Sequence, residues 1–204
     1  MVKYIAHRQN DLKKLANLKK QSFSGIEFDL RSTSKKIILN HDPFKKGLDF
    51  FKNYKLLKKF FLLIDIKSTG ISSKVYNLLK NKNYKFLFLN LTQPEMTQML
   101  DKGYGKNLFI RYSFYEKVDL NKKKLNKINW VWVDFFENYF IPLKDYKYLK
   151  KFKKKICLTS PDLVELKKKS LIKYINHLNK YKIKADIVCV KIKNLKIWKQ
   201  YYKF

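Results

Sequence analysis

Short apolar runs, separated by polar and helix-like segments, dominate the pattern of the chain. Each run is nearly apolar throughout and rich in β-branched and aromatic residues, which is typical of strands covered on both faces. Between most runs, apolar residues recur at helical spacing, as at Leu171, Ile175 and Leu178. Alternating strands and helices indicate parallel βα units. The predicted strands are residues 4–6, 26–30, 37–39, 61–66, 86–91, 108–112, 130–135, 156–158 and 187–190.

One of the eight connections between these nine strands differs from the rest. Residues 31–36, Arg-Ser-Thr-Ser-Lys-Lys, are too few for a crossover helix and predict a tight turn between antiparallel strands. Eight parallel strands then remain, the number that closes a barrel. We therefore predict an α/β fold with a single domain, residues 1–204, forming a small or slightly irregular TIM-type (β/α)8 barrel with a hairpin after strand 2. An open doubly wound sheet is the alternative, and a terminal helix is expected after Lys193.

No glycine-rich phosphate loop follows any predicted strand, which argues against nucleotide binding of the P-loop or dinucleotide type. The longest apolar stretch, residues 60–64, is far shorter than the roughly 20 residues of a membrane-spanning helix. Because the first predicted strand begins at residue 4, no signal peptide precedes it, and we expect a cytoplasmic protein without a transmembrane segment. Cys157 and Cys189 lie in predicted strands and are expected to be core thiols, whereas His177, in a lysine-rich helix, is expected at the surface.

The charge is strongly positive. The chain has 47 basic and 16 acidic residues, a formal charge of +31, and only three of the basic residues are arginine. Lysine together with abundant Asn, Ile, Phe and Tyr is the composition that an AT-rich genome favours, and this is one interpretation of the charge. The other is functional: residues 141–204 carry 19 lysines and four acidic residues, a balance of +15, and are the candidate for a weak contact with an anionic surface. Such a contact would not distinguish one nucleic-acid sequence from another, so no specific nucleic-acid partner is expected.

Ionisable side chains recur where the predicted strands end. In a barrel these carboxyl ends meet at one rim, where the chemistry of the fold is located. Glu27 and Asp29 are two residues apart on one strand and therefore share a face. The residues at these ends are His7, Arg8, Glu27, Asp29, His41, Asp42, Asp65, Lys67, Arg111, Ser113, Asp134 and Ser160.

These residue types fit the hydrolysis of a phosphodiester. Glu27, Asp29 and Asp65 are hard oxygen ligands suited to a divalent cation, Mg²⁺ or Ca²⁺. The cation would polarise a phosphoryl oxygen and lower the pKa of a bound hydroxyl. Two histidines and two cations complete the set: His7 and His41 as acid and base, and Arg8 and Lys67 on the non-bridging oxygens. The alternative is structural, with the carboxylates in salt bridges that plug the barrel mouth and the histidines in the core.

At these residues the chain resembles the glycerophosphodiester phosphodiesterases of the phospholipase C-like barrel superfamily. The motifs that carry the resemblance, over the first third of the chain, are His7-Arg8, Glu27-Phe28-Asp29, His41-Asp42 and Asp65-Ile66-Lys67. The resemblance implies an enzyme of lipid metabolism, a phosphoric diester hydrolase with two acid–base histidines, a carboxylate-bound divalent metal and a small-molecule phosphodiester substrate. Two positions depart from the family pattern: Gln9 stands where the family has glycine, and Asp65 where it has glutamate.

The later Trp-Thr-x-Asn signature of that family is missing, and residues 156–162 take its place. The whole chain is more similar to a short branch of the superfamily found beside surface-polysaccharide genes, which implies a glycan-linked or polyol phosphodiester. In that branch Arg31, Arg111, Ser113 and Asp134 are further substrate-binding candidates on the rim. The motifs shared with the branch are residues 27–31, 41–44, 66–70, 130–134 and 160–163.

Two other functions stay open on the sequence. A barrel with weak or no catalysis that binds a phosphosugar or a lipid head group would use the same anion pocket. A basic polyanion-binding protein would use the charge of residues 141–204.

Overall fold

The structure is a computed structural model that describes residues 1–164 and 168–204. Contacts within the chain divide it into two compact units: the N-terminal unit, Ile5–Leu108, and the C-terminal unit, Met1–Tyr4 with Phe109–Phe204. Each unit is described separately. The organisation as a single domain stays a prediction.

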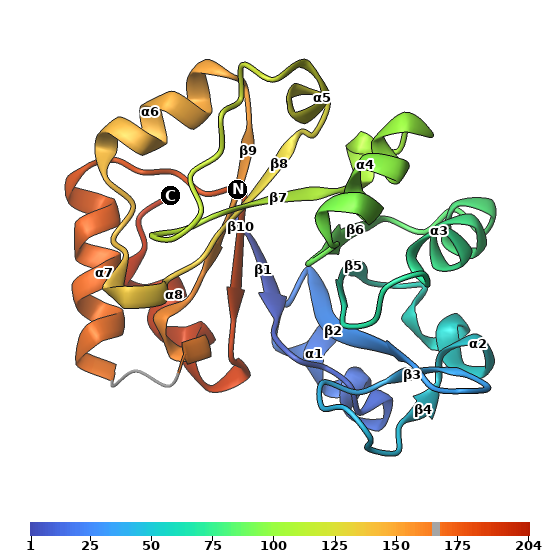
Figure 1. Cartoon of the computed structure of the whole chain (residues 1–204). Coiled ribbons are helices and arrows are strands. Elements are labelled where there is room, and N and C mark those ends of the chain that lie inside the picture. The colour runs from blue at the N-terminus through green and yellow to red at the C-terminus, as the bar shows by residue number, and fades with distance from the viewer. Residues whose placement is uncertain (165–167) are drawn as a thin grey trace. The chain divides into compact units, whose positions relative to one another are not determined.

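Parallel strands form the centre of the N-terminal unit (Figure 1). The end of β1 pairs with β2, β2 pairs with β5, and β5 pairs with β6. The predicted hairpin is confirmed, because β2 and β3 are antiparallel, and β3 pairs in turn with a short antiparallel strand, β4. The elements are β1 (Lys3–Ala6), α1 (Leu15–Lys20), β2 (Gly25–Ser32), β3 (Ile37–Leu39), β4 (Leu48–Asp49), α2 (Phe50–Asn53), β5 (Phe61–Ile66), α3 (Ser72–Asn81), β6 (Phe86–Leu89) and α4 (Gln93–Asp101).

A glycine allows the close approach of β2 and β5. A Cβ atom at Gly25 would lie 2.1 Å from the carbonyl oxygen of Phe61. From that point the two strands run in register for six residue pairs, and the register places Asp29 directly beside Asp65. The backbone pairing therefore brings together two acidic residues that are 36 positions apart in the sequence.

The C-terminal unit holds four parallel strands in the order β10-β9-β8-β7. The predicted terminal helix is present as α8, in which the buried Trp198 donates a hydrogen bond from Nε1 to Ser160 Oγ, 2.8 Å away. The elements are β7 (Phe109–Tyr112), α5 (Lys123–Asn126), β8 (Trp130–Val133), α6 (Leu143–Lys151), β9 (Lys155–Thr159), α7 (Lys168–Lys180), β10 (Ile187–Val190) and α8 (Leu195–Tyr201).

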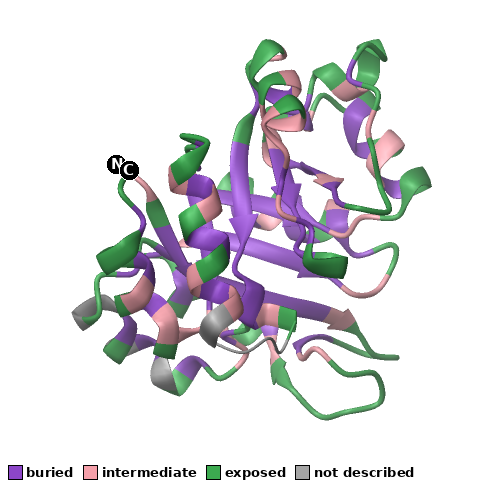
Figure 2. Cartoon of the chain, turned by 90° about the vertical axis from the view of Figure 1, so that its left-hand side faces the viewer, coloured by how far each residue is buried: buried purple, intermediate pink, exposed green. Residues whose placement is uncertain are grey.

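All nine predicted strands are present, and burial follows their pattern. Figure 2 shows strands that are buried along nearly their whole length and helices whose outer faces are exposed. Cys157 and Cys189 are buried in β9 and β10, as expected of core thiols. His177 is half-buried, and its Nε2 lies 2.9 Å from the carbonyl oxygen of Ile141, so the prediction of a surface histidine is wrong. Within the described residues, no helix is long and apolar enough to cross a membrane.

Candidate functional site

Three acidic side chains of the N-terminal unit converge at the carboxyl ends of β2 and β5. Glu27 and Asp29 point to one face of β2 because side chains alternate along a strand, and Asp65 lies beside Asp29 on β5. One carboxylate oxygen from each residue lies within 4.8 Å of the others. All three side chains are buried, with exposed fractions of 2%, 2% and 6%. We call Glu27, Asp29 and Asp65 the acidic cluster.

Burial and mutual repulsion disfavour the ionised forms of carboxylates in the acidic cluster. Burial raises the pKa of Glu27 well above its usual value, and repulsion by Asp29 and Asp65 raises it further. Burial also raises the pKa of Asp65, although Lys67 and Asn90 oppose that shift. Lys67 Nζ lies 2.7 Å from Asp65 and 3.5 Å from Asp29. Hard, closely spaced carboxylate oxygens fit a divalent cation such as Mg²⁺ or Ca²⁺.

The segment after β1 turns sharply onto the acidic cluster. Arg8 has a left-handed backbone with φ 54°, and its amide donates a hydrogen bond of 2.6 Å to Glu27 Oε2. The amide of Gln9 donates to the carbonyl oxygen of Glu27, while its side-chain amide folds back onto the carbonyl oxygen of His7. His7 Nε2 is held 3.6 Å from Glu27 Oε2. Gln9 therefore fits a tight turn where the resembled family has glycine.

His41 lies in the loop after β3 and is held by Asp42 and Arg31. Its Nδ1 lies 2.8 Å from Asp42 Oδ1, and its carbonyl oxygen accepts a hydrogen bond of 2.9 Å from Arg31 Nε. Arg31 Nη1 also donates to the carbonyl oxygen of Lys67, 3.3 Å away. The hydrogen bond between Asp42 and the His41 ring lowers the pKa of Asp42. The charges of His41, Arg8 and Lys45 lower it further. The structure thus gives Arg31 a role in fastening the His41 loop and β5 together.

Two asparagines that the sequence analysis did not select orient the carboxylates. Asn10 Nδ2 donates to Asp29 Oδ2 at 2.8 Å, and Asn10 Oδ1 accepts from the Asp29 amide at 2.9 Å. Asn90 Nδ2 lies 2.8 Å from both oxygens of Asp65, while Asn90 Oδ1 is buried without a hydrogen-bond partner among the described residues. Asn90 follows β6 with a left-handed φ of 60°, which turns its side chain back onto the strand ends. Asn90 lies inside the predicted strand 86–91, so the apolar pattern gave no signal for this role.

Four of the predicted rim residues belong to the C-terminal unit: Arg111, Ser113, Asp134 and Ser160. Arg111 Nε lies 2.8 Å from Asp134 Oδ2, and Trp132 Nε1 donates to Asp134 Oδ1 at 2.7 Å. Ser113 Oγ accepts hydrogen bonds from the amides of Tyr115 and Glu116. These contacts order the segment after β7, and the substrate-binding role of Arg111, Ser113 and Asp134 stays a prediction.

The Ser160–Leu163 motif serves the core of the C-terminal unit. Ser160 and Asp162 are buried and hydrogen-bonded to each other. Ser160 also accepts from Trp198 of α8, and Asp162 Oδ2 accepts from the amide of Lys191, which follows β10. The motif therefore joins the ends of β9 and β10 to the terminal helix.

The chain matches no protein-family model and no curated protein. Its fold, however, matches solved structures over almost its whole length. Glycerophosphodiester phosphodiesterase from Agrobacterium tumefaciens aligns with a TM-score of 0.69 at 10% identity, covering 98% of this chain and 100% of that one. The Oleispira antarctica phosphodiesterase in complex with the product sn-glycerol-3-phosphate aligns with a TM-score of 0.65 at 14% identity, covering 97% and 95%.

A Ca²⁺-dependent phosphatidylinositol-specific phospholipase C from Streptomyces antibioticus aligns with a TM-score of 0.56 at 9% identity, covering 97% of this chain and 96% of that one. At such identities the likeness establishes the fold. The chain therefore shares the α/β fold of these solved phosphodiesterases, which supports the barrel fold class predicted from the sequence.

Proposed function

We propose that this chain, which shares its fold with the glycerophosphodiester phosphodiesterases, is a metal-dependent hydrolase of small glycerol-, polyol- or glycan-linked phosphodiesters. The barrel fold hosts many reactions, so the proposal depends on the site. The observation that carries it is the acidic cluster, in which three buried carboxylates share a space of 4.8 Å beside His7 and Lys67.

The residues of the proposed site have three roles. Glu27, Asp29 and Asp65 hold the divalent cation, which polarises a phosphoryl oxygen when bound. Lys67 and Arg8 neutralise the charge that grows on the non-bridging oxygens. The two histidines move the protons.

Each histidine is assigned one proton transfer. Because the Nδ1–H of His41 donates to Asp42, its Nε2 is left to accept the proton of the attacking hydroxyl. His7, whose Nε2 lies 3.6 Å from Glu27 Oε2, donates a proton to the leaving alkoxide. A new P–O bond forms with the attacking oxygen as the P–O bond to the alcohol breaks, so one proton is taken up and one is given back.

Hydrolysis of glycerophosphoglycerol tests the function. We expect release of glycerol phosphate in the presence of Mg²⁺, Mn²⁺ or Ca²⁺, and a loss of at least about 100-fold when a chelator is added, because the cation supplies several kcal/mol of charge stabilisation. A phosphomonoester serves as the control that excludes a contaminating phosphatase. Absence of turnover with every cation, in protein that binds the cation, would contradict the proposal.

A binding module without turnover is the second candidate. It is favoured by the contacts of Asp65, whose two oxygens are already engaged by Asn90 and Lys67. In that case the pocket would hold a phosphosugar or a lipid head group and release it unchanged. Saturable binding of glycerol phosphate without hydrolysis of any diester would favour this candidate. A contact of residues 141–204 with anionic surfaces stays a separate prediction.

Asn90 is expected to support cation binding through Asp65. Replacing Asn90 by alanine removes the amide that orients Asp65, and changes of this kind behind a metal ligand lower affinity by about 10–100-fold. Isothermal titration of the protein with Ca²⁺ and Mg²⁺ measures the effect. Asn81→Ala, at an exposed position that ends α3, is the control and should leave affinity unchanged. Equal affinities in the two variants would show that Asp65 needs no support from Asn90.

A further inference from the structure

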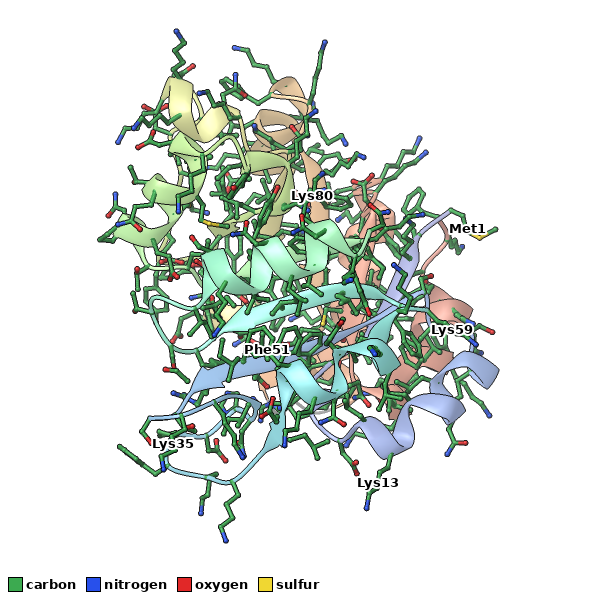
Figure 3. All side chains as sticks on the ribbon, turned by 90° about the vertical axis from the view of Figure 1, so that its right-hand side faces the viewer. Met1, Lys13, Lys35, Phe51, Lys59 and Lys80 are labelled. Atoms are coloured by element: carbon green, nitrogen blue, oxygen red, sulfur yellow. The ribbon has the colours of Figure 1, made fainter. Side chains whose placement is uncertain are left out.

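A cationic cavity lies beside the loop that carries His41. Its walls are the β2–β3 hairpin and the loop between β3 and β4, and its volume is about 680 Å³. Figure 3 faces this part of the N-terminal unit and labels Lys35 at the hairpin turn. The lining residues are Arg31, Ser32, Thr33, Ser34, Lys36, Ile38, Asp42, Phe44, Lys45, Lys46 and Gly47. We call this the hairpin cavity.

Four of the lining side chains are cationic and one is anionic. Arg31, Lys36, Lys45 and Lys46 line the cavity together with Asp42, whose carboxylate is already bonded to the His41 ring. The structure shows two bonds of the Arg31 guanidinium, from Nε and Nη1, and no described residue holds Nη2. The hairpin cavity therefore presents a net positive charge and unused donors.

The walls of the hairpin cavity are fixed by hydrogen bonds. Thr33 closes the hairpin turn through its amide and hydroxyl, both of which bond Lys36. In the opposite wall Asn40 Nδ2 donates to the carbonyl oxygen of Lys46 at 2.7 Å, and the Asp42 amide donates to Asn40 Oδ1 at 2.9 Å. The lysine side chains are thus carried by a backbone that these hydrogen bonds hold in place, a form of preorganisation that favours binding.

The hairpin cavity adjoins the proposed reaction site through shared residues. Arg31 both lines the cavity and bonds the carbonyl oxygens of His41 and Lys67, and Asp42 both lines the cavity and bonds the His41 ring. Arg31 also lies in phase with Glu27 and Asp29 along β2, so the three side chains emerge on the same face of the strand. A group attached to a phosphorus at the acidic cluster would follow this face of β2 towards the hairpin cavity.

We propose that the hairpin cavity is a second anion subsite, and that the preferred substrate is a phosphodiester in which one esterified alcohol carries a further anionic group, a phosphate or a carboxylate. This inference rests on the proposed hydrolase function, which it deepens by naming the substrate class. Four cations around one cavity favour an anionic group and disfavour alcohols with an ammonium group.

Two measurements separate the subsite from the hydrolase function. The first is kcat/KM for glycerophosphoglycerol against the same diester carrying a terminal phosphate. The second is the Kd of glycerol phosphate in the presence of EDTA, where the metal-free acidic cluster repels phosphate and leaves the hairpin cavity as the binding site. The test variant is Lys36→Gln/Lys45→Gln/Lys46→Gln, which spares Arg31 because that residue also fastens the His41 loop.

The matched control removes the same charge elsewhere in the N-terminal unit. It is Lys59→Gln/Lys80→Gln/Lys106→Gln, three exposed lysines outside the hairpin cavity, of which Lys59 and Lys80 lie away from Lys35 in Figure 3. We expect the test variant to lower kcat/KM for the charged diester and affinity for glycerol phosphate by about tenfold, with little change for the neutral diester. The effect should shrink at high salt.

The outcomes distinguish the two proposals. If neither diester is hydrolysed but glycerol phosphate binds in EDTA and only the test variant loses it, the anion subsite stands and the hydrolase function fails. If both diesters are hydrolysed equally well and the test and control variants behave alike, the subsite is refuted while the hydrolase function stands. Equal losses in both lysine variants would show a general charge effect and also refute the subsite.

Discussion

His41→Ala is expected to lower kcat by roughly 10²–10⁴-fold, the usual contribution of a positioned acid or base, while leaving the melting temperature nearly unchanged. The reason for the small effect on stability is the surroundings of the ring. His41 lies in a loop, is about one third exposed, and its ring bonds only the exposed Asp42 among the described residues. The loop is held in position by the hydrogen bond from Arg31 Nε to the His41 carbonyl oxygen, a backbone group that His41→Ala keeps.

Activity and thermal unfolding measured on the same preparations check this expectation. His177→Ala is a matched control, because it removes a half-buried imidazole from the C-terminal unit, where His177 bonds Ile141. That control should lose some stability and no activity. If His41→Ala unfolds instead, or keeps full activity, the acid–base role of His41 is wrong and the structural interpretation of the histidines gains support.

Glu27→Gln is expected to abolish divalent-cation binding and to stabilise the metal-free protein. The carboxylate of Glu27 is 2% exposed and is repelled by two others, and burial with this repulsion raises its pKa. Glutamine keeps an oxygen that can accept the hydrogen bond from the Arg8 amide. The charge alone is removed, so the gain in the free energy of unfolding should be on the order of 1–3 kcal/mol.

The pH dependence of this gain has a definite sign. Because the pKa of Glu27 is higher in the folded than in the unfolded state, protonation of Glu27 favours folding. This contribution to the free energy of unfolding is complete below the unfolded pKa and is lost as the pH rises through the folded pKa. Wild type and Glu27→Gln should therefore be about equally stable near pH 4, the unfolded pKa of glutamate, and diverge as the pH rises. Excess Ca²⁺ or Mg²⁺ should reverse the order, since about 100-fold saturation adds roughly 2.7 kcal/mol to wild type alone.

Denaturant unfolding at several pH values, with cation or with EDTA, measures both effects. Glu137→Gln removes one exposed carboxylate from the C-terminal unit and should show neither. A Glu27→Gln protein that is less stable than wild type in EDTA at pH 8 would mean that the acidic cluster is a set of structural salt bridges. The expectation of a cation site would then be wrong.

The sequence predicted the strands from local patterns, and it predicted the acidic cluster from alternation along β2 together with the expectation that parallel strand ends meet at one rim. The short connection at 31–36 sufficed for the β2–β3 hairpin, and alternation along β2 placed Glu27 beside Asp29. β4 escaped prediction, since Leu48–Asp49 is too short for a pattern and forms by pairing with β3. The predicted strand 86–91 ran past the end of β6 because Asn90 turns to a left-handed conformation, which an apolar pattern does not reveal.

Two of the residues that orient the site could not be predicted. Asn10 and Asn90 lie outside the motifs, and nothing in their spacing sets them apart from the other asparagines of the chain, whereas Asp42 was selected together with His41. Their roles follow from tertiary contacts: Asn10 meets Asp29 across 19 positions and Asn90 meets Asp65 across 25. Arg31 was predicted as a substrate contact, and its bonds to two backbone carbonyl oxygens emerge only from the fold.

The bonds of Arg31 also bear on why the chain uses arginine at all. Of 47 basic residues three are arginine, so lysine supplies almost every positive charge. An ammonium group is a compact point charge, whereas a guanidinium is a rigid fork that can reach two acceptors at a fixed separation. Position 31 requires that fork, since Nε and Nη1 bind carbonyl oxygens from segments 26 residues apart. A lysine at position 31 would keep the positive charge but lose the fork geometry. The His41 loop and the segment at Lys67, which Arg31 now couples, would then be able to move independently.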